Sequence, residues 1–384
     1  MNSRSIIGRD PASGNVLEVI IENGRIRAII PSPIEEAPWL SAGFIDLQVN
    51  GYLGNDANSE EVDADVILSL TNNMLALGVT TFLPTVITAS EVKIIRALRA
   101  IADARRAYPR VAHAIPFVHV EGPFISPNDG PRGAHDRDYV RPANFDEFER
   151  WQEACGNLVG MVTLSPHDDA TLECISALAA KGIVVALGHS DATPAQIHAA
   201  ANAGATLSTH LGNGLGSPLP RHPNLLWAQL AEDRLTATFI ADGHHLPTDT
   251  LKSMLRAKTI NRSILVSDVV SLGGMPVGRY LADVGGVVEV TVDGRVISGN
   301  GGGFLAGAYR TLPVGIAHAA SIDGVSLGGA IQMATENPGR FVGRNANLHV
   351  GASAELVLFD WSPQEPITSA LEIRSVYVAG QEVQ

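Results

Sequence analysis

Two histidines mark the points where consecutive apolar runs of this chain end. His189 closes the run GIVVALGH, and His210 closes the run ATLSTH. Glu121 occupies the same position in the earlier run AIPFVHVE. One carboxylate and two imidazoles, with a fourth position left to water, form a common ligand set for a catalytic divalent ion. The alternative is a buried carboxylate and two hydrogen-bonded core histidines. The shared position at three strand ends favours a hydrolytic metal site.

Two further residues have the chemistry that such a site needs. Asp268, in ILVSDVV, is the candidate general base, which would take a proton from the attacking water and pass it to the leaving amine. A helix N-cap or a structural ion pair is the alternative for this aspartate. His135, in RGAHDRDYV, could polarise a substrate carbonyl from the loop after the Glu121 run. Otherwise it is a surface loop histidine.

Gln48 and Asn50 suggest how many ions the site holds. Many metal-dependent hydrolase barrels carry His-x-His at the end of their first strand, where it holds a second metal. This chain has amides at the corresponding positions, in GFIDLQVNG. Amides are poor ligands for a transition metal. We therefore expect one divalent ion per chain, zinc with iron as the alternative, and we assign both amides to ligand support or substrate contact.

Arg221 and His245 are candidates for holding an anionic group. Arg221 lies in the Gly- and Pro-rich stretch LGNGLGSPLPRHPN, which is typical of a shaped loop. A guanidinium holds phosphate through two parallel hydrogen bonds. A solvated loop arginine is the alternative. His244 and His245 are adjacent at one strand end, so only one of them can point inward, and we assign His245 to the site.

Eight apolar, strand-like runs alternate with helical patterns along the chain. The runs cover residues 43–51, 80–88, 114–122, 158–166, 182–190, 205–213, 235–243 and 264–270. Near-continuous apolar strands separated by helices indicate a parallel sheet. Eight of them, without a GxGxxG turn in the first unit, predict a (β/α)8 TIM barrel rather than a doubly wound sheet. The candidate site residues then converge at the carboxyl ends of the barrel strands.

The two ends of the chain have a different pattern. VLEVIIENGRIRAII alternates apolar and polar residues around Asn23-Gly24, which predicts a hairpin, and β patterning returns from about residue 348. We expect residues 1–42 and 346–384 to form one small β-sandwich domain. Residues 43–345 then form the hydrolase barrel, with a β-hairpin excursion near 279–300 around Asp293-Gly294.

The net charge and the number of cysteines exclude some classes of partner and compartment. The net charge of −13 argues against nucleic acid or an anionic membrane as a partner, and an anionic small substrate would need basic groups of its own. Cys155 and Cys174 are the only cysteines, which fits a reducing cytoplasm. The N-terminal sequence lacks a signal-like apolar region, and no apolar run approaches the ~18 residues of a membrane span. We therefore expect a cytoplasmic enzyme.

The motifs together resemble the N-acetylglucosamine-6-phosphate deacetylases of the amidohydrolase superfamily over nearly the full length. The matching motifs are, in order, GFIDLQVNG, HVEGPF with RGAH, LGHSDA, THLxN, Arg221 with Pro223, ADGHH, VSD and the terminal VGASAELVLFD. The resemblance implies a metal-dependent deacetylase that acts on an amino-sugar 6-phosphate.

The resemblance also implies individual roles. Glu121, His189 and His210 would hold the metal, and Asp268 would be the acid/base. His135 would contact the acetyl carbonyl and His245 the sugar. The phosphate would be bound by Asn213, Gly214 and Arg221. In that family the arginine reaches into the partner subunit's site, so a homodimer is implied.

Some loops depart from the family pattern, as at Gly212-Asn213-Gly214-Leu215 and Ser165-Pro166-His167. The leading hypothesis is deacetylation of N-acetylglucosamine 6-phosphate to acetate and the amino-sugar phosphate. The alternatives are N-acetylgalactosamine 6-phosphate, another N-acyl or cyclic amide, and a non-catalytic sugar-phosphate sensor on the same barrel.

Overall fold

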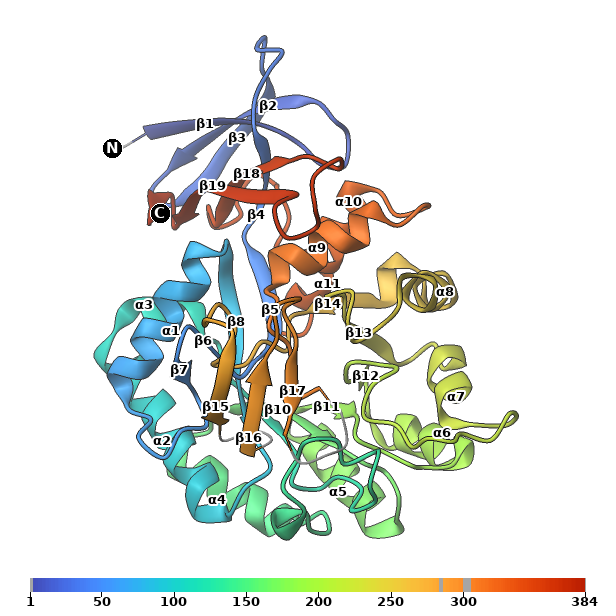
Figure 1. The fold of residues 1–384 in the computed structure, drawn as a ribbon. Helices are drawn as coiled ribbons and strands as arrows, with labels where there is room; N and C mark the ends of the chain where they lie inside the picture. The colour runs from blue at the N-terminus through green and yellow to red at the C-terminus, as the bar shows by residue number, and fades with distance from the viewer. Residues whose placement is uncertain (1–2, 283–285, 300–304, 384) are drawn as a thin grey trace.

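Eight parallel strands form the central element of the fold (Figure 1). The computed structural model describes residues 3–282, 286–299 and 305–383. The strands are β5 (Phe44–Val49), β8 (Val79–Ile87), β9 (Val118–Glu121), β10 (Val159–Leu164), β11 (Val184–Leu187), β12 (Leu207–Ser208), β13 (Thr236–Ile240) and β14 (Ser263–Val266). They pair in chain order from β5 to β14, so the predicted barrel of eight runs is confirmed.

The first and last strands approach each other through a few specific contacts. Asp268 N donates to Gln48 O at 3.0 Å, and Asn50 N donates to Val269 O at 2.8 Å. Deeper in the barrel, the Asp46 carboxylate accepts the Ser267 N–H at 3.2 Å. These contacts close the barrel and place the residue pair Gln48 and Asn50 beside Asp268.

Each barrel strand is followed in the chain by at least one helix. The helices are α1 (Ala64–Ala76), α2 (Glu91–Ala107), α3 (Pro109–Ala114), α4 (Phe145–Cys155), α5 (Asp169–Ala180), α6 (Pro194–Ala203), α7 (Leu225–Ala231), α8 (Thr248–Lys258), α9 (Leu312–Ser321), α10 (Leu327–Met333) and α11 (Glu336–Gly339). Their apolar faces pack on the outside of the strands in one large core. A second core, which includes Leu47, Met161 and Ile264, fills the barrel interior. The strands are apolar on both faces for this reason.

The two chain ends combine into one seven-stranded sheet. Its strands are β1 (Ser3–Arg9), β2 (Val16–Glu22), β3 (Arg25–Pro31), β4 (Trp39–Ala42), β18 (Leu356–Trp361), β19 (Leu371–Val378) and β20 (Gln381–Glu382). The β2–β3 turn at Asn23-Gly24 has positive φ at both residues, as the hairpin prediction required. A bridge from Arg25 to Ser353 folds the sheet over a small core of its own, so the sandwich is one curled sheet. Figure 1 shows this sheet at one side of the barrel, above the ring of helices, and β19 contacts α1 and α9 there.

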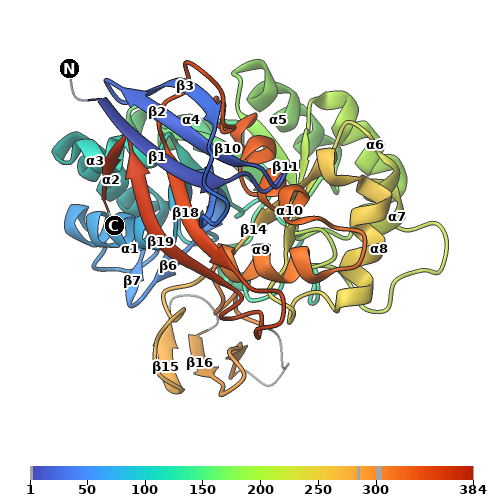
Figure 2. The same cartoon turned by 90° about the horizontal axis from the view of Figure 1, so that it is seen from above.

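A small sheet, between β14 and α9 in the chain, lies in front of the barrel in Figure 1, and Figure 2 shows it outside the barrel on that side. It contains β15 (Gly278–Ala282), β16 (Gly286–Val290) and β17 (Val296–Ser298). β16 and β17 form a hairpin around Asp293-Gly294, and β15 adds a third strand beside β16. The short pair β6 (Gly51–Tyr52) and β7 (Asn55–Asp56) follows β5. In the described part of the chain, no helix has the length and apolarity to cross a membrane.

Candidate metal centre and active site

Glu121, His189 and His210 meet at the carboxyl end of the barrel. His210 Nε2 lies 3.1 Å from both Glu121 Oε1 and His189 Nε2, and His189 Nε2 lies 3.3 Å from Glu121 Oε1. In a tetrahedral zinc site with bonds of ~2.0–2.1 Å, neighbouring ligand atoms are about 3.3 Å apart. All three residues are buried. The donor set and its spacing therefore fit one divalent ion.

The backbone turns at the strand ends aim these side chains. His189 and His210 come just after β11 and β12, with one residue between strand and histidine in each case, and their φ angles are +48° and +30°. Asp268, beyond β14, has a φ of +52°. Non-glycine residues rarely adopt this left-handed region, and such strain tends to accumulate at functional sites. A second contact orients the His189 ring, because Nδ1 donates to Pro131 O at 2.9 Å and leaves the lone pair of Nε2 free to bind a metal.

The amides of β5 hold the two carboxylates of the site. Gln48 Nε2 lies 3.1 Å from each oxygen of Glu121 and 3.1 Å from Asp268 Oδ1. Asn50 Nδ2 donates to the same Asp268 oxygen at 2.8 Å. Gln48 therefore braces a ligand and the candidate base together. Asn50 Oδ1 is buried and accepts no hydrogen bond from any described group, so it remains available to a ligand.

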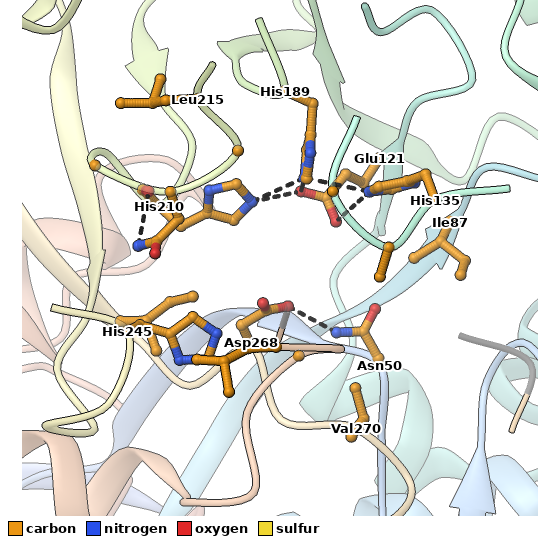
Figure 3. Close-up of a pocket in the computed structure, with 18 of the residues that line it drawn as sticks. Asn50, Ile87, Glu121, His135, His189, His210, Leu215, His245, Asp268 and Val270 are labelled. Carbon is orange, nitrogen blue, oxygen red and sulfur yellow. Dashed lines mark hydrogen bonds and ion pairs between the residues drawn. The ribbon is translucent and has the colours of Figure 1, made fainter. Parts of the chain in front are cut away.

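Asp268 faces the ligand cluster across the cavity (Figure 3). Burial, reinforced by the charge of Glu121, raises the pKa of Asp268 to about 6. Burial alone would also raise the pKa of Glu121, but hydrogen bonds from His189 and His210 hold it well below its usual range. Glu121 is thus ionised, as a ligand must be, while Asp268 has a pKa close to neutral pH, which suits a proton carrier.

His135 lies on the other side of His189, with 3.2 Å between the two Nε2 atoms. Its Nδ1 is 2.8 Å from the Thr88 hydroxyl. Burial, with a contribution from the charge of His189, lowers the pKa of His135 to about 3, so the ring is neutral. A neutral imidazole beside the ion site can donate one hydrogen bond to a substrate carbonyl.

The site opens into a cavity of about 350 Å³. His245, Asn213 and Gly214 are among its lining residues, and Gly214 lies next to His189. His245 is fixed by its Nδ1, 2.7 Å from Asp242 Oδ2, and this hydrogen bond outweighs burial and raises the pKa of His245. His244 turns away from the cavity, and its Nε2 contacts Asp293 O at 3.0 Å in the β16–β17 turn. Apolar side chains cover the remaining walls: Ile87, Ala134, Leu215, Ile240, Val270 and Leu305.

Most of the residues predicted from the sequence gather at this cavity, and two do not line it. The lining includes Asn50, Glu121, His135, His189, His210, Asn213, Gly214, His245 and Asp268. Gln48 lies behind the carboxylates, so its role as a direct substrate contact is not supported by its position. Arg221 is exposed in the segment between β12 and α7. No lysine or arginine of the described residues lines the cavity.

Several contributors were not identified from the sequence. Thr88 ends an apolar run, and its position gave no sign that its hydroxyl reaches His135. Pro131 acts through its carbonyl, which no side-chain motif reveals. Arg310 donates to Asp242 O at 2.6 Å and to Asp293 O at 3.2 Å, joining the small sheet to the loop of His245. All three contacts join residues that are far apart in the sequence, so they become visible only in the tertiary structure.

Comparison with known proteins gives a consistent picture. The amidohydrolase family model matches residues 39–383. The chain is 31% identical to the N-acetylglucosamine-6-phosphate deacetylase of Bacillus subtilis, over 83% of this chain and 80% of that protein. It is 30% identical to the N-acetylgalactosamine-6-phosphate deacetylase of Escherichia coli O157:H7, over 94% and 93%.

A solved structure is similar along the whole chain. It is a mutant N-acetyl-D-glucosamine-6-phosphate deacetylase from Mycobacterium smegmatis in complex with N-acetyl-D-glucosamine-6-phosphate. The TM-score is 0.87 with 26% identity, and the match covers 99% of both chains.

Metal analysis tests the ligand cluster. We expect the wild-type protein to saturate at one divalent ion per chain, and His189→Ala to lose the ion because one of three protein ligands is gone. His198→Ala is the matched control, since His198 lies on α6 in a contact with Glu232. Elemental analysis after dialysis gives the occupancy. Two ions per chain, or full occupancy in His189→Ala, would contradict the assignment.

Asp268→Asn tests the proton carrier. The asparagine retains an oxygen for the Gln48 and Asn50 amides, so metal content should stay near wild type while kcat falls by about 10²–10⁴-fold. In the wild type, kcat/KM should fall as the pH drops through about 6 or below, because only ionised Asp268 accepts a proton. A bound cation would lower the pKa of Asp268, so kcat/KM would then begin to fall at a lower pH. A mild loss of kcat would remove Asp268 from the role.

Proposed function

Because this chain belongs to the amidohydrolase family, among the N-acetylglucosamine-6-phosphate deacetylases, and is a hydrolase of amide bonds, we propose that it deacetylates an amino-sugar 6-phosphate. N-acetylglucosamine 6-phosphate is the first candidate substrate, giving acetate and the amino-sugar phosphate. The observation that carries the proposal is the buried Glu121, His189 and His210 cluster, which faces Asp268 across a cavity that also holds His245.

The side chains supply the other parts of an amide hydrolysis. When bound, the divalent ion acidifies water and polarises the carbonyl. Asp268 takes the proton of the attacking water and gives it to the amine nitrogen as the carbon–nitrogen bond breaks. His135 donates to the carbonyl oxygen, where negative charge develops. Asn50 Oδ1, which lacks a partner among the described residues, can accept the amide N–H of the substrate.

The phosphate requires a cation that one chain does not bring to its own cavity. Asn213, Gly214 and His245 line the cavity, and the lining residues of the described chain include no lysine or arginine. The segment between β12 and α7, which contains Arg221, projects beyond the ring of helices in both views (Figures 1 and 2). We place Arg221 of a second copy at the phosphate, which makes the functional unit a homodimer.

N-acetylgalactosamine 6-phosphate is the second candidate substrate. A relative named for that activity matches nearly the full chain. Gly212 and Gly214 flank Asn213, so this part of the cavity lining carries little side-chain bulk. The sugars differ only in the configuration of one hydroxyl, and such discrimination depends on where the site places its hydrogen-bonding groups.

Metal and compartment complete the proposal. We favour zinc, because one carboxylate and two imidazoles at tetrahedral spacing suit it, and iron is the alternative. We place the enzyme in the cytoplasm. Cys155 and Cys174 are free and buried, which suits a reducing compartment, and phosphorylated sugars are charged intracellular metabolites.

An acetate-release assay tests the substrate assignment. We expect N-acetylglucosamine 6-phosphate or its galactosamine analogue to be hydrolysed with the highest kcat/KM, and the same sugars without phosphate to be much poorer. The panel should include N-acetyl amino acids and cyclic amides. Preference for one of those, or no turnover of any amino sugar by the metal-loaded protein, would refute the proposal.

Arg221→Ala tests the phosphate contact between subunits. We expect KM for the phosphorylated sugar to rise by about 10–100-fold, since a charge-assisted pair is lost, with little change for the unphosphorylated sugar. Arg279→Ala is the control, because Arg279 is an exposed arginine on β15.

A mixed dimer then separates action within a subunit from action between subunits. A heterodimer of Arg221→Ala with Asp268→Asn has one site with intact Asp268 that receives the arginine of the other chain. At a substrate concentration well below the KM of Arg221→Ala, such dimers should be more active than either variant alone. No recovery in a verified heterodimer would place Arg221 in its own site or outside both sites.

A further inference from the structure

Thr88 lies next to the active site without contributing to the cavity wall. It follows β8 directly and is 4% exposed. Its hydroxyl oxygen is 2.8 Å from His135 Nδ1 and 3.5 Å from Glu121 O. His135 belongs to the loop after β9, so this contact joins two neighbouring β/α units.

The distances indicate which partner receives the hydroxyl proton. The 2.8 Å contact has the length of a strong hydrogen bond, whereas 3.5 Å is at the limit of one. Donation to His135 Nδ1 therefore gives the better network. A neutral imidazole has one proton, so its proton then lies on Nε2. That nitrogen faces the ion site, 3.2 Å from His189 Nε2 and 4.0 Å from Glu121 Oε2.

Gly122, which follows Glu121, leaves space for the Thr88 hydroxyl. Gly122 has a φ of +73°, and a Cβ built on it would lie 2.1 Å from Thr88 Oγ1. No side chain fits there while the hydroxyl keeps its place. The glycine of the HVEGPF motif therefore leaves room for the contact between Thr88 and His135, as well as permitting the turn after β9.

We propose that Thr88 is a positioning residue that fixes the Nε2–H tautomer and the orientation of His135, so that the ring donates to the substrate carbonyl. Its hydroxyl hydrogen bond to Nδ1 determines which ring nitrogen carries the proton. Without it, the proton can move to Nδ1, and Nε2 then presents a lone pair to the carbonyl oxygen. The role against the carbonyl rests on the proposed function, whereas the tautomer does not.

The test compares Thr88→Val, which keeps the shape and removes the hydroxyl, with Thr88→Ser, which restores it. We expect Thr88→Val to lower kcat by about 10–100-fold, the scale of a misplaced catalytic group, with metal content and thermal midpoint near wild type. Thr88→Ser should stay within a few-fold of wild type. Thr71→Val, which removes a buried hydroxyl bonded to Ile67 O in α1, is the control.

A spectroscopic readout follows the tautomer directly. In zinc-loaded protein with 15N-labelled histidine, two-dimensional NMR distinguishes protonated from bare ring nitrogens, and the His135 signals are assigned by their loss in His135→Ala. We expect the proton on Nε2 in wild type and Thr88→Ser, and on Nδ1 or shared in Thr88→Val. The same tautomer in wild type and Thr88→Val would overturn the proposal, as would unchanged kcat in Thr88→Val.

A double variant, Thr88→Val with His135→Ala, tests whether Thr88 affects activity through His135. If Thr88 acts through His135, adding Thr88→Val to His135→Ala should cost no further activity. A further loss, or loss of the metal in Thr88→Val alone, would assign Thr88 a general structural role and refute the inference. If wild type hydrolyses no N-acetyl sugar, the proposed function fails, and the tautomer comparison still decides the role of Thr88.

Discussion

The site brings the ring nitrogens of two histidines and a carboxylate oxygen so close together that a positive charge is needed between them. His189 and His210 bring their Nε2 atoms within 3.1 Å of each other, and both lie beside a carboxylate oxygen of Glu121 in the buried end of the barrel. Without a shared positive charge, two neutral imidazole lone pairs would repel each other and Glu121 would be a buried anion, which is costly. Protonation of the histidines or a bound ion relieves this. The spacing of about one tetrahedral edge favours the ion.

The barrel holds these groups together by giving each its own rigid support. Parallel strands bring their carboxyl ends to one face, and left-handed residues at positions 189, 210 and 268 then turn the side chains inward. The same contacts that close the barrel between β5 and β14 carry Gln48 to both carboxylates. The contacts that close the barrel therefore also set the geometry of the site. A local change in the pairing of residues 46–50 with 267–269 would disturb the two acids simultaneously.

The sequence predicted the barrel and the ligand cluster because both follow periodic rules. Apolar runs reveal strands, and a polar residue where a run stops lies at the catalytic face, as Glu121, His189, His210 and Asp268 do. The third strand of the small sheet was not predictable in this way, nor was the choice between ligand support and substrate contact for Gln48. They depend on which side chains meet across strands far apart in sequence. Thr88 was hidden for the same reason, since its partner His135 lies 47 positions away.

The charges around the cavity suit a metal ion, but they do not suit the phosphate of the proposed substrate. An ion among Glu121, His189 and His210 would balance the nearby carboxylates. His245, which lies near Asp268, has a raised pKa, but Asp242 beside it offsets any positive charge that it gains. Among the described residues, no lysine or arginine lines the cavity to balance a substrate phosphate. Under the proposed function, a substrate phosphate would then need a cation from outside the cavity, and Arg221 in the projecting segment between β12 and α7 is the candidate.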